Sequence, residues 1–443
     1  MKWQLLLSTL WWSVSPVSNA ELVGPWTSVW SGLDAEWRGQ YKLRLTQGLE
    51  NVDLRVLQHS LLPELDLTLP GDLRLHMEGR LRFDERDRLE PGSTNDSKYR
   101  SDWSRRHEFG DRGEAELLEF YVDGYAGDTF FRMGKQTIAW GAAIGLEVLD
   151  VVNPVTMREF VLPDRDERRI PLWAVNIERP VGDWMASFIW LPDTSYEQMP
   201  VPGAAFAIRP PAFLMQPDTH WLEADRPDDP ISDADFGTQV TSFIAGWDVS
   251  LNYLYHYNDQ PVLERQSHDT HVSVKPIYYR THTLGGSLSN AFGDFTLRAE
   301  FGYDTRQYYP NADESIITGW SRSPEVSSVV GVDYSGVSDW LISTQLFSSY
   351  LPDYRSGLIR ERRQDRATLL IRGDLFGHTQ TAEMLVIHSL DQHDGIFQLA
   401  WDYRLRSHIT LQAMLDIPYG RASGVFGQFR HLDQFSLGLE YSF

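Results

Sequence analysis

Apolar and polar residues alternate along many short stretches of the chain. In the last ten residues, Phe435, Leu437, Leu439, Tyr441 and Phe443 alternate with small or polar residues. Because successive side chains of a β-strand point to opposite faces, this period of two predicts a strand with one apolar face. The same alternation recurs at 293–304 and at 397–404. The pattern predicts an all-β protein.

Short turns and longer polar segments separate these predicted strands from about residue 72 onward. Gly-Asp stands directly before a strand at 71–72, 127–128, 182–183 and 293–294, where glycine supplies the positive φ that tight hairpin turns need. Strict alternation of short and long connections would match the short periplasmic turns and long extracellular loops of an outer-membrane barrel. The expected long loops are 84–114, 138–170, 193–235, 259–277, 307–324, 351–364 and 418–432.

The connections predict a transmembrane antiparallel up-and-down β-barrel of about eighteen strands, with sixteen as the alternative. This count includes one early strand near 41–47. Residues 1–20 resemble a signal peptide, because Lys2 precedes a short apolar stretch and small residues end at Ala20. Residues 21–37 are then a periplasmic lead-in and 38–443 the barrel.

Composition changes this interpretation in three ways. A mean hydropathy of -0.36 resembles a soluble protein, but a barrel alternates lipid-facing and lumen-facing residues, so the average hides its apolar face. Aromatic residues make up 13% of the chain, which suits the aromatic girdles of membrane barrels. A net charge of -22 argues against nucleic acid as a partner, and the absence of cysteine excludes disulfides and thiolate sites. A water-soluble β-sandwich is the alternative fold.

The final strand predicts a cellular address and partners. Its ending, Leu439-Glu440-Tyr441-Ser442-Phe443, resembles the C-terminal signal that the barrel-assembly machinery reads. We therefore expect the bacterial outer membrane as the location. The expected partners are that machinery, outer-membrane lipid and lipopolysaccharide, while an inner-membrane transporter is left open.

Charged residues of both signs lie opposite the apolar faces, where a barrel has its lumen. They could set solute selectivity, or they could form salt bridges that brace the wall. The residues expected to line the lumen are Arg74, His76, Glu78, Arg80, Arg82, Arg298, Glu300, Arg372, Asp374, Asp402 and Arg404.

Two long loops depart from a polar surface composition. Ile144, Leu146, Val148 and Val151 are apolar within the loop 138–170, so part of it should fold back into the barrel and narrow the pore, or form a packed plug without selectivity. Residues 200–208 of the loop 193–235 are also apolar, which suits either an amphipathic solute or packing on the rim. The residues expected near the constriction are Arg165, Asp166, Glu167, Arg168 and Arg169.

The motifs Gly134-Lys135-Gln136, Trp140-Gly141 and Leu149-Asp150-Val151-Val152-Asn153-Pro154 resemble a proteobacterial outer-membrane β-barrel family of largely uncharacterised function. The chain also resembles, more loosely, porins and the alginate-export type of barrel. This resemblance implies transport, with neither solute nor direction defined.

The expected function is therefore a channel or transporter that moves small or amphipathic solutes through a charged, loop-constricted lumen. The alternatives are a structural or adhesin barrel with a sealed lumen and an outer-membrane hydrolase. The chain contains no Gly-x-Ser-x-Gly elbow and no His-Glu-x-x-His motif, so we expect no catalytic residue, cofactor or metal. A hydrolase would have to use histidines assembled by the fold, such as His256, His282, His388 and His408.

Overall fold

The structure is a computed structural model that describes residues 34–50, 52–92, 98–141, 143, 145–163, 165–209, 211, 214, 219–267 and 272–443. The predicted signal peptide, most of the predicted lead-in and Ile144 lie outside the described residues.

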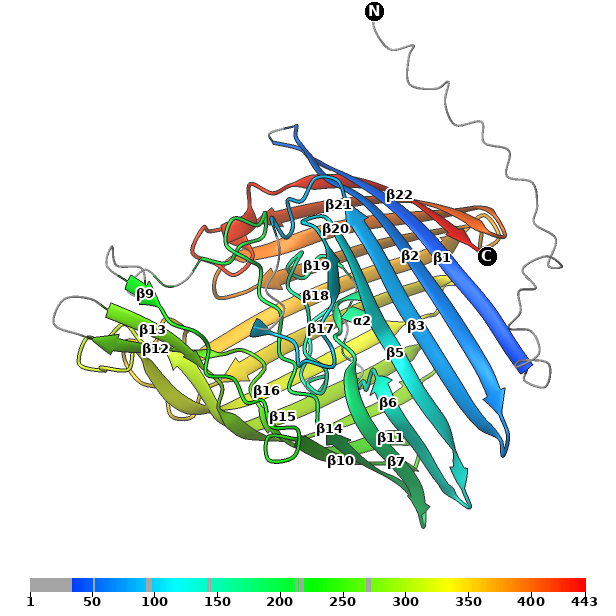
Figure 1. Cartoon of the computed structure of the whole chain (residues 1–443), viewed down its shortest axis with the longest axis horizontal. Coiled ribbons are helices and arrows are strands. Elements are labelled where there is room, and N and C mark those ends of the chain that lie inside the picture. Colours follow the sequence, from blue (N-terminus) through cyan, green and yellow to red (C-terminus); the bar gives the residue numbers. More distant parts are fainter. Residues whose placement is uncertain are drawn as a thin grey trace, which may run out of the picture.

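A closed antiparallel barrel of 18 strands forms the body of the protein (Figure 1). Each strand pairs with the next along the wall, and the last pairs with the first, where Tyr441 lies opposite Tyr41. The predicted count is confirmed. The wall strands are β1 (Asp34–Gly48), β2 (Leu54–Leu69), β3 (Leu73–Asp84), β5 (Gly113–Ala126), β6 (Thr129–Gln136), β7 (Leu172–Val181), β8 (Trp184–Leu191), β10 (Asp235–Ile244), β11 (Trp247–Tyr257), β14 (Arg280–Phe292), β15 (Phe295–Pro310), β16 (Trp320–Tyr334), β17 (Trp340–Tyr350), β18 (Arg363–Leu375), β19 (Gln380–Ser389), β20 (Asp394–Arg406), β21 (Ile409–Tyr419) and β22 (Gln434–Ser442).

The remaining elements belong to the loops. The short strand β4 (His107–Phe109) pairs with β5 alone. A separate sheet of β9 (Thr219–Trp221), β12 (Val262–Ser267) and β13 (Val272–Ile277) lies beyond the strand ends, at the left of Figure 1. Two single-turn helices are described, α2 (Arg165–Arg168) and η3 (Gly427–Phe429). Among the described residues, the helices are too short and too polar to cross a membrane.

Burial on the two faces of the wall is the reverse of that in a soluble β-protein. Along β22, Leu437 is 50% exposed while Ser436 is 5% exposed, and the same order holds along the rest of the strand. The exposed apolar side chains therefore face outward, and the polar ones face the enclosed lumen. This arrangement, in one closed sheet, excludes the β-sandwich alternative.

The glycines of the tight turns have the positive φ that the sequence analysis predicted for them. Gly127 and Gly182 have φ of 62° and 60° in the hairpins after β5 and β7, a backbone region that side chains rarely adopt. These tight turns share the barrel end that carries the first residue of β1 and the last of β22. We call this end the turn end and the opposite one the loop end.

Two sequence expectations about the first strands are wrong. β1 begins at Asp34 rather than after residue 37, and 54–69 forms β2, which the pattern did not indicate. In β2 the adjacent apolar residues Leu61 and Leu62 interrupt the period of two, because Leu62 faces the lumen while Leu61 faces outward. The alternation of connections is also not strict, since 49–53 and 390–393 are short links at the loop end.

The assignment of faces predicts opposite outcomes for one substitution at neighbouring positions of β20. Leu399 is exposed on the outer face and Ala400 lines the lumen. Leu399→Arg should lower the free energy of unfolding in lipid by about 2–4 kcal/mol, the cost of a guanidinium near the bilayer midplane. Ala400→Arg is the matched control and should cost much less. Denaturant titration of the protein in lipid vesicles measures both, and equal losses would contradict the assignment.

Candidate functional site

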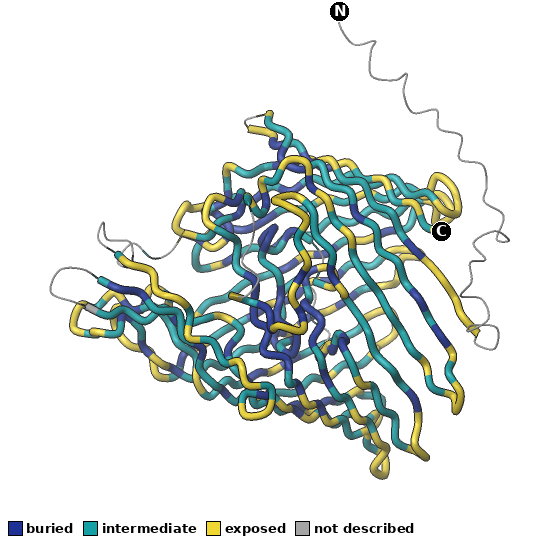
Figure 2. The backbone as a smooth tube through the Cα atoms, viewed as in Figure 1, coloured by how far each residue is buried: buried dark blue, intermediate teal, exposed yellow. Residues whose placement is uncertain are grey.

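Residues 137–171, which connect β6 to β7, enter the barrel and cross its lumen. We call them the inward segment. Leu149 packs against Gly285 of β14, while Glu159 accepts a hydrogen bond of 2.6 Å from Arg44 of β1. β1 and β14 lie half-way round the wall from each other. Figure 2 shows the buried part of the chain concentrated in the middle of the barrel.

Apolar clusters hold the inward segment to the lumen face of the wall. Val148 and Leu149 pack with Val329 of β16 and Phe347 of β17. Phe160 packs with wall residues on the far side and with two loop phenylalanines, Phe426 and Phe429, that enclose its ring. These contacts bury apolar side chains that an exposed loop would leave in water.

Two polar residues fasten the ends of the inward segment together. The amide of Asn153 accepts a hydrogen bond of 2.7 Å from the backbone N–H of Ile138 and donates one of 2.7 Å to the carbonyl oxygen of Ile170. Gln136 donates to the carbonyl oxygen of Ala174 on β7. Gly134 has φ of 132°, and a Cβ at this position would collide with the carbonyl oxygen of Phe120. The chain therefore leaves and rejoins the wall at a defined point.

The charged residues around α2 form ion pairs within the inward segment. Arg165 and Arg169 both contact the carboxylate of Asp150, at 3.2 and 2.6 Å. Arg168 is buried and lies 3.5 Å from Glu147. Asp166 pairs with Arg169, and Glu167 lies 3.3 Å from Lys42 of β1. The side chains of Asp166 and Glu167 remain 86% and 61% exposed, so their charge is available to solute.

A cavity of about 730 Å³ lies between the inward segment and the wall formed by β1–β5 and β18–β22. Basic and acidic side chains balance in its lining, with eight of each. The basic residues are Lys42, Arg44, Arg80, Arg82, Arg158, Arg168, Arg169 and Arg372, and the acidic ones are Glu78, Glu119, Glu159, Asp166, Glu167, Glu383, Asp402 and Asp416.

A second cavity, of about 690 Å³, lies between the start of the inward segment and the wall from β7 to β15. Gly141 of the inward segment and Glu300 of β15 line it together. A Cβ at residue 141 would lie 2.9 Å from the Glu300 carboxylate. Glycine thus permits the close approach of the two elements.

The predicted lumen residues all lie on the lumen face by register, but they separate into three sets. Arg298 and Glu300 line the second cavity, whereas Arg74, His76, Asp374 and Arg404 line neither cavity. The other five line the first cavity, as do four of the five predicted constriction residues, Arg165 being the exception.

An ion network that the sequence analysis missed fixes the inward segment at the loop end. Glu90 contacts Arg82, Arg106 and Arg158 at 3.1, 3.2 and 2.7 Å. Burial alone would raise the pKa of Glu90, but these three guanidinium groups lower it well below its usual value. Next to them, Glu116 accepts from Arg80 and Arg100. These contacts, together with that of Glu114 with Arg82 at 2.7 Å, favour a bracing role for Arg80 and Arg82. Of the acidic residues in this network, only Glu114 and Glu116 could have been placed on the lumen face from the sequence, because polar and apolar residues alternate at the start of β5.

The apolar part of the loop 192–234 packs inward rather than forming an open patch. Phe206 is buried, and its ring lies 5.7 Å from that of Phe429. Gln198 is hydrogen-bonded through its backbone to Val155 and Met157 of the inward segment. The loop therefore covers the inward segment from the loop end.

The histidines do not form a hydrolytic relay in the described residues. His256 bonds Thr283 at 2.9 Å, and the Thr283 hydroxyl donates to Asp304. A nucleophile–histidine–carboxylate relay places the histidine in the middle, whereas here the hydroxyl occupies that position. His282 and His388 bond tyrosine hydroxyls. The side chains with metal-ligand spacing lie elsewhere, around His76.

Comparison with known proteins places this architecture in a family. The family model described as "Protein of unknown function (DUF1302)" matches residues 60–441. The chain belongs to this family. No curated protein matches the chain by sequence.

Solved structures share the fold of this DUF1302 chain at low sequence identity. OccAB1 of Acinetobacter baumannii is 9% identical, with a TM-score of 0.51, and the similarity covers 93% of this chain and 96% of that one. OpdK of Pseudomonas aeruginosa, solved with vanillate, is 10% identical, with a TM-score of 0.50 and coverage of 93% and 98%. The chain thus shares with these structures the fold of a closed transmembrane β-barrel.

The motifs that carried the resemblance in this DUF1302 chain are the ones that build the inward segment. Gly134 and Gln136 shape its departure from β6, and Asn153 joins its two ends. Asp150 holds Arg165 and Arg169. The residues of these motifs therefore fix the inward segment in place. They do not indicate which solute the protein binds or conducts.

Removal of the Asn153 amide should release the inward segment without opening the barrel. Asn153→Ala leaves the buried N–H of Ile138 and the carbonyl of Ile170 unpaired, which costs about 1–3 kcal/mol each. Hydrogen exchange across 137–171 should accelerate while the wall strands stay protected. Asn176→Ala is the control, because that amide bonds only wall residues: it donates to Glu178 on the same strand and accepts from Ser187 on β8. Unchanged exchange in Asn153→Ala would contradict this role.

The covering loop should loosen as pH rises. Burial raises the pKa of Glu197 from 4.5 to about 7, so the folded loop holds a proton that the open loop releases above pH 4.5. Stability is then greatest in acid and falls by up to about 3 kcal/mol as pH rises through 7. Hydrogen exchange of 193–209, corrected for intrinsic rate, should be less protected at pH 8 than at pH 5. Glu197→Gln should reduce this difference, and a difference as large as in the wild type would exclude Glu197 as its cause; burial also raises the pKa of the neighbouring Asp259, which acts in the same direction.

Proposed function

We propose that this chain is an outer-membrane channel that conducts small polar solutes past the inward segment, without a chemical step. One observation carries the proposal: a segment with exposed charges crosses the lumen of a closed barrel and leaves water-accessible cavities beside it. A barrel of this size without such a segment would be a wide aqueous pore. The inward segment therefore acts as the constriction.

The charge balance of the first cavity supports weak rather than strong ion selectivity. Its eight basic and eight acidic side chains cancel, although the whole chain carries a net charge of -22. Most basic side chains there are held in ion pairs, whereas Asp166 and Glu167 are exposed. The negative charge of these two carboxylates then favours the passage of cationic or zwitterionic solutes beside α2.

Small polar solutes fit the lining better than amphipathic ones. The amphipathic class rested on the apolar residues 200–208, and Phe206 of that stretch is packed in the interior. The first cavity is lined largely by charged and hydroxyl side chains. We propose polar organic ions of low molecular weight as the solutes.

Location and partners follow from the same proposal. The outward apolar face would contact outer-membrane lipid and lipopolysaccharide, and β22 would present its terminal residues to the barrel-assembly machinery. The loop end would face the exterior, because long loops are extracellular in such barrels. An inner-membrane transporter is a further candidate partner on the periplasmic side.

Single-channel recording of the refolded protein in planar bilayers tests the proposal. The wild type should give discrete conductance steps with a slight cation preference. The double variant Asp166→Asn/Glu167→Gln should move the reversal potential in a salt gradient towards that of an anion-preferring pore. Asp313→Asn/Glu314→Gln is the charge-matched control, because both residues lie in the loop 311–319 between β15 and β16, and it should leave the reversal potential unchanged.

If the protein is folded, as judged by circular dichroism, but gives no conductance steps, the channel proposal is overturned and a sealed structural barrel is favoured. Conductance that is equally selective in the double variant would place the constriction away from α2. Ester or peptide hydrolysis by the same preparation would favour the enzyme alternative.

A further inference from the structure

Three neighbouring strands place glutamates in one row on the lumen face. Glu64 of β2 lies directly opposite Glu78 of β3, and Glu78 lies directly opposite Glu119 of β5. Like charges at directly opposed positions destabilise a sheet. The central member, Glu78, therefore has a carboxylate on both sides, and a cation would relieve the repulsion.

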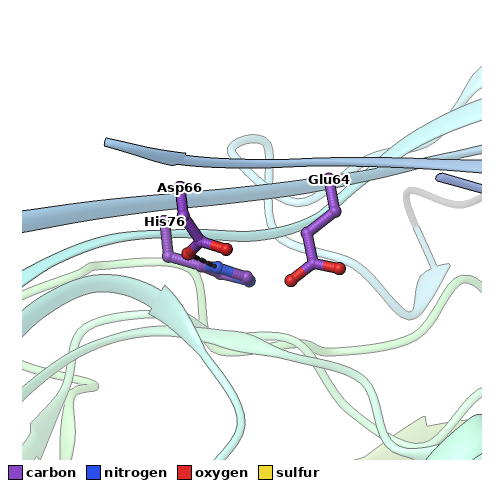
Figure 3. A group of neighbouring side chains, drawn as sticks. All are labelled: Glu64, Asp66 and His76. Carbon is purple, nitrogen blue, oxygen red and sulfur yellow. Dashed lines mark hydrogen bonds and ion pairs between the residues drawn. The ribbon is translucent and has the colours of Figure 1, made fainter. Parts of the chain in front are cut away.

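The next row places an imidazole beside these carboxylates. Its members are Asp66, His76 and Tyr121. The Nδ1 atom of His76 lies 2.8 Å from a carboxylate oxygen of Asp66, a contact drawn as the dashed line in Figure 3. The ring stacks on Tyr121 with centroids 4.9 Å apart. Both contacts orient the ring, and an Nδ1–H donated to Asp66 leaves the lone pair on Nε2.

That lone pair points towards the row of glutamates. The Nε2 atom of His76 lies 3.7 Å from a carboxylate oxygen of Glu119, which is longer than a hydrogen bond and leaves room for an ion between them. Ligand atoms of His76, Glu78 and Glu119 all lie within 4.8 Å of one another. Histidine bonded to a metal through Nε2 and to a carboxylate through Nδ1 is a recurrent arrangement in metal sites.

The charges around the site leave a deficit of positive charge. Four carboxylates surround His76, namely Glu64, Asp66, Glu78 and Glu119. Arg38 of β1 contacts Glu64 and Asp66, at 2.7 and 2.5 Å, and so neutralises the side away from Glu119. Arg80, the next lumen-facing residue after Glu78, pairs with Glu116. Among the described residues, Glu78 and Glu119 form no ion pair with an arginine or lysine, and Glu119 accepts one hydrogen bond, from the backbone N–H of Thr137.

We propose that His76, Glu78 and Glu119 bind a divalent transition-metal ion at the lumen wall, with Asp66 as the residue that positions the imidazole. One nitrogen and two carboxylate oxygens suit Zn²⁺, which can be held by three protein ligands with water in the fourth position. Ca²⁺ and Mg²⁺ prefer oxygen ligands alone and should bind more weakly. Glu78 and Glu119 line the first cavity, so an ion can reach the site from the lumen.

Bound metal would also change conduction. A divalent ion at this point adds positive charge to a cavity whose charges otherwise balance, so it should reduce the passage of cations. This second part of the inference rests on the proposed channel function, whereas metal binding itself does not.

Isothermal titration calorimetry of the chelator-treated full barrel with Zn²⁺ tests the binding. The wild type should bind one ion with a saturable isotherm, and His76→Ala and Glu119→Gln should each lower the affinity at least about tenfold. Ca²⁺ should bind more weakly and be little affected by His76→Ala. A wild type without saturable Zn²⁺ binding, or a His76→Ala variant with unchanged affinity, would overturn the site.

Two controls match these variants. His388→Ala removes an imidazole that also stacks on a tyrosine, Tyr419, but that is not among the proposed ligands. Asp123→Asn removes the same charge as Glu119→Gln two lumen positions away, where Asp123 pairs with Arg132. Both should bind Zn²⁺ like the wild type, and a loss as large as in Glu119→Gln would show nonspecific attraction instead of a site.

The two proposals fail separately. Zn²⁺ binding that depends on His76 in a barrel that gives no current would retain the site and overturn the channel. A conducting barrel without Zn²⁺ binding would do the reverse. In a conducting barrel that binds the ion, micromolar Zn²⁺ should reduce cation current in the wild type and not in His76→Ala, and equal reduction would overturn the effect on conduction.

Discussion

Closure of the sheet between β22 and β1 is the constraint on which the rest of the structure depends. A lipid environment offers no hydrogen-bond partners, so every backbone N–H and carbonyl of a spanning strand must be paired within the protein. The ladder from Gln40 to Gly48 along β22 removes the last two free edges. Once the sheet is closed, one face of each strand must contact lipid and the other must enclose a lumen. The reversed burial of Leu437 and Ser436 is a direct consequence.

A closed wall of 18 strands encloses more space than its own side chains fill, and the inward segment is how this chain occupies that space. Apolar packing and ion pairs both hold the inward segment in place. Apolar residues such as Leu149 and Phe160 pack on lumen-facing apolar positions. Charged residues such as Asp150 and Arg158 are paired, which is required of charges removed from water.

Local patterns in the sequence predicted the wall well because its determinants are local. Alternation assigns a residue to a face within a few positions, and the turn after β5 needs a positive φ at Gly127. β2 was missed because Leu62 places an apolar residue on the lumen face, which local alternation cannot distinguish from the end of a strand.

The contacts that define the site could not be predicted because they join distant parts of the chain. Arg158 meets Glu90, and Glu159 meets Arg44, and these pairs follow from the path of the inward segment across the lumen. Likewise, the row of Glu64, Glu78 and Glu119 exists only once the register of three strands is known. His76 was predicted to face the lumen, but the two carboxylates nearest its ring nitrogens, those of Asp66 and Glu119, come from the strands on either side.

The charge of the lumen lining differs from the net charge of the whole chain. A net charge of -22 suggests a cation pore only if the excess lies on the pathway, and the lining of the first cavity is neutral. Within that neutral lining the arginines gather at the loop end of β3 and β5, where Glu90 and Glu116 hold them, while Glu78 and Glu119 lie opposite each other beside His76. The proposed metal site would therefore attract a cation at one point of the wall, a property that the net charge of the whole chain could not have indicated.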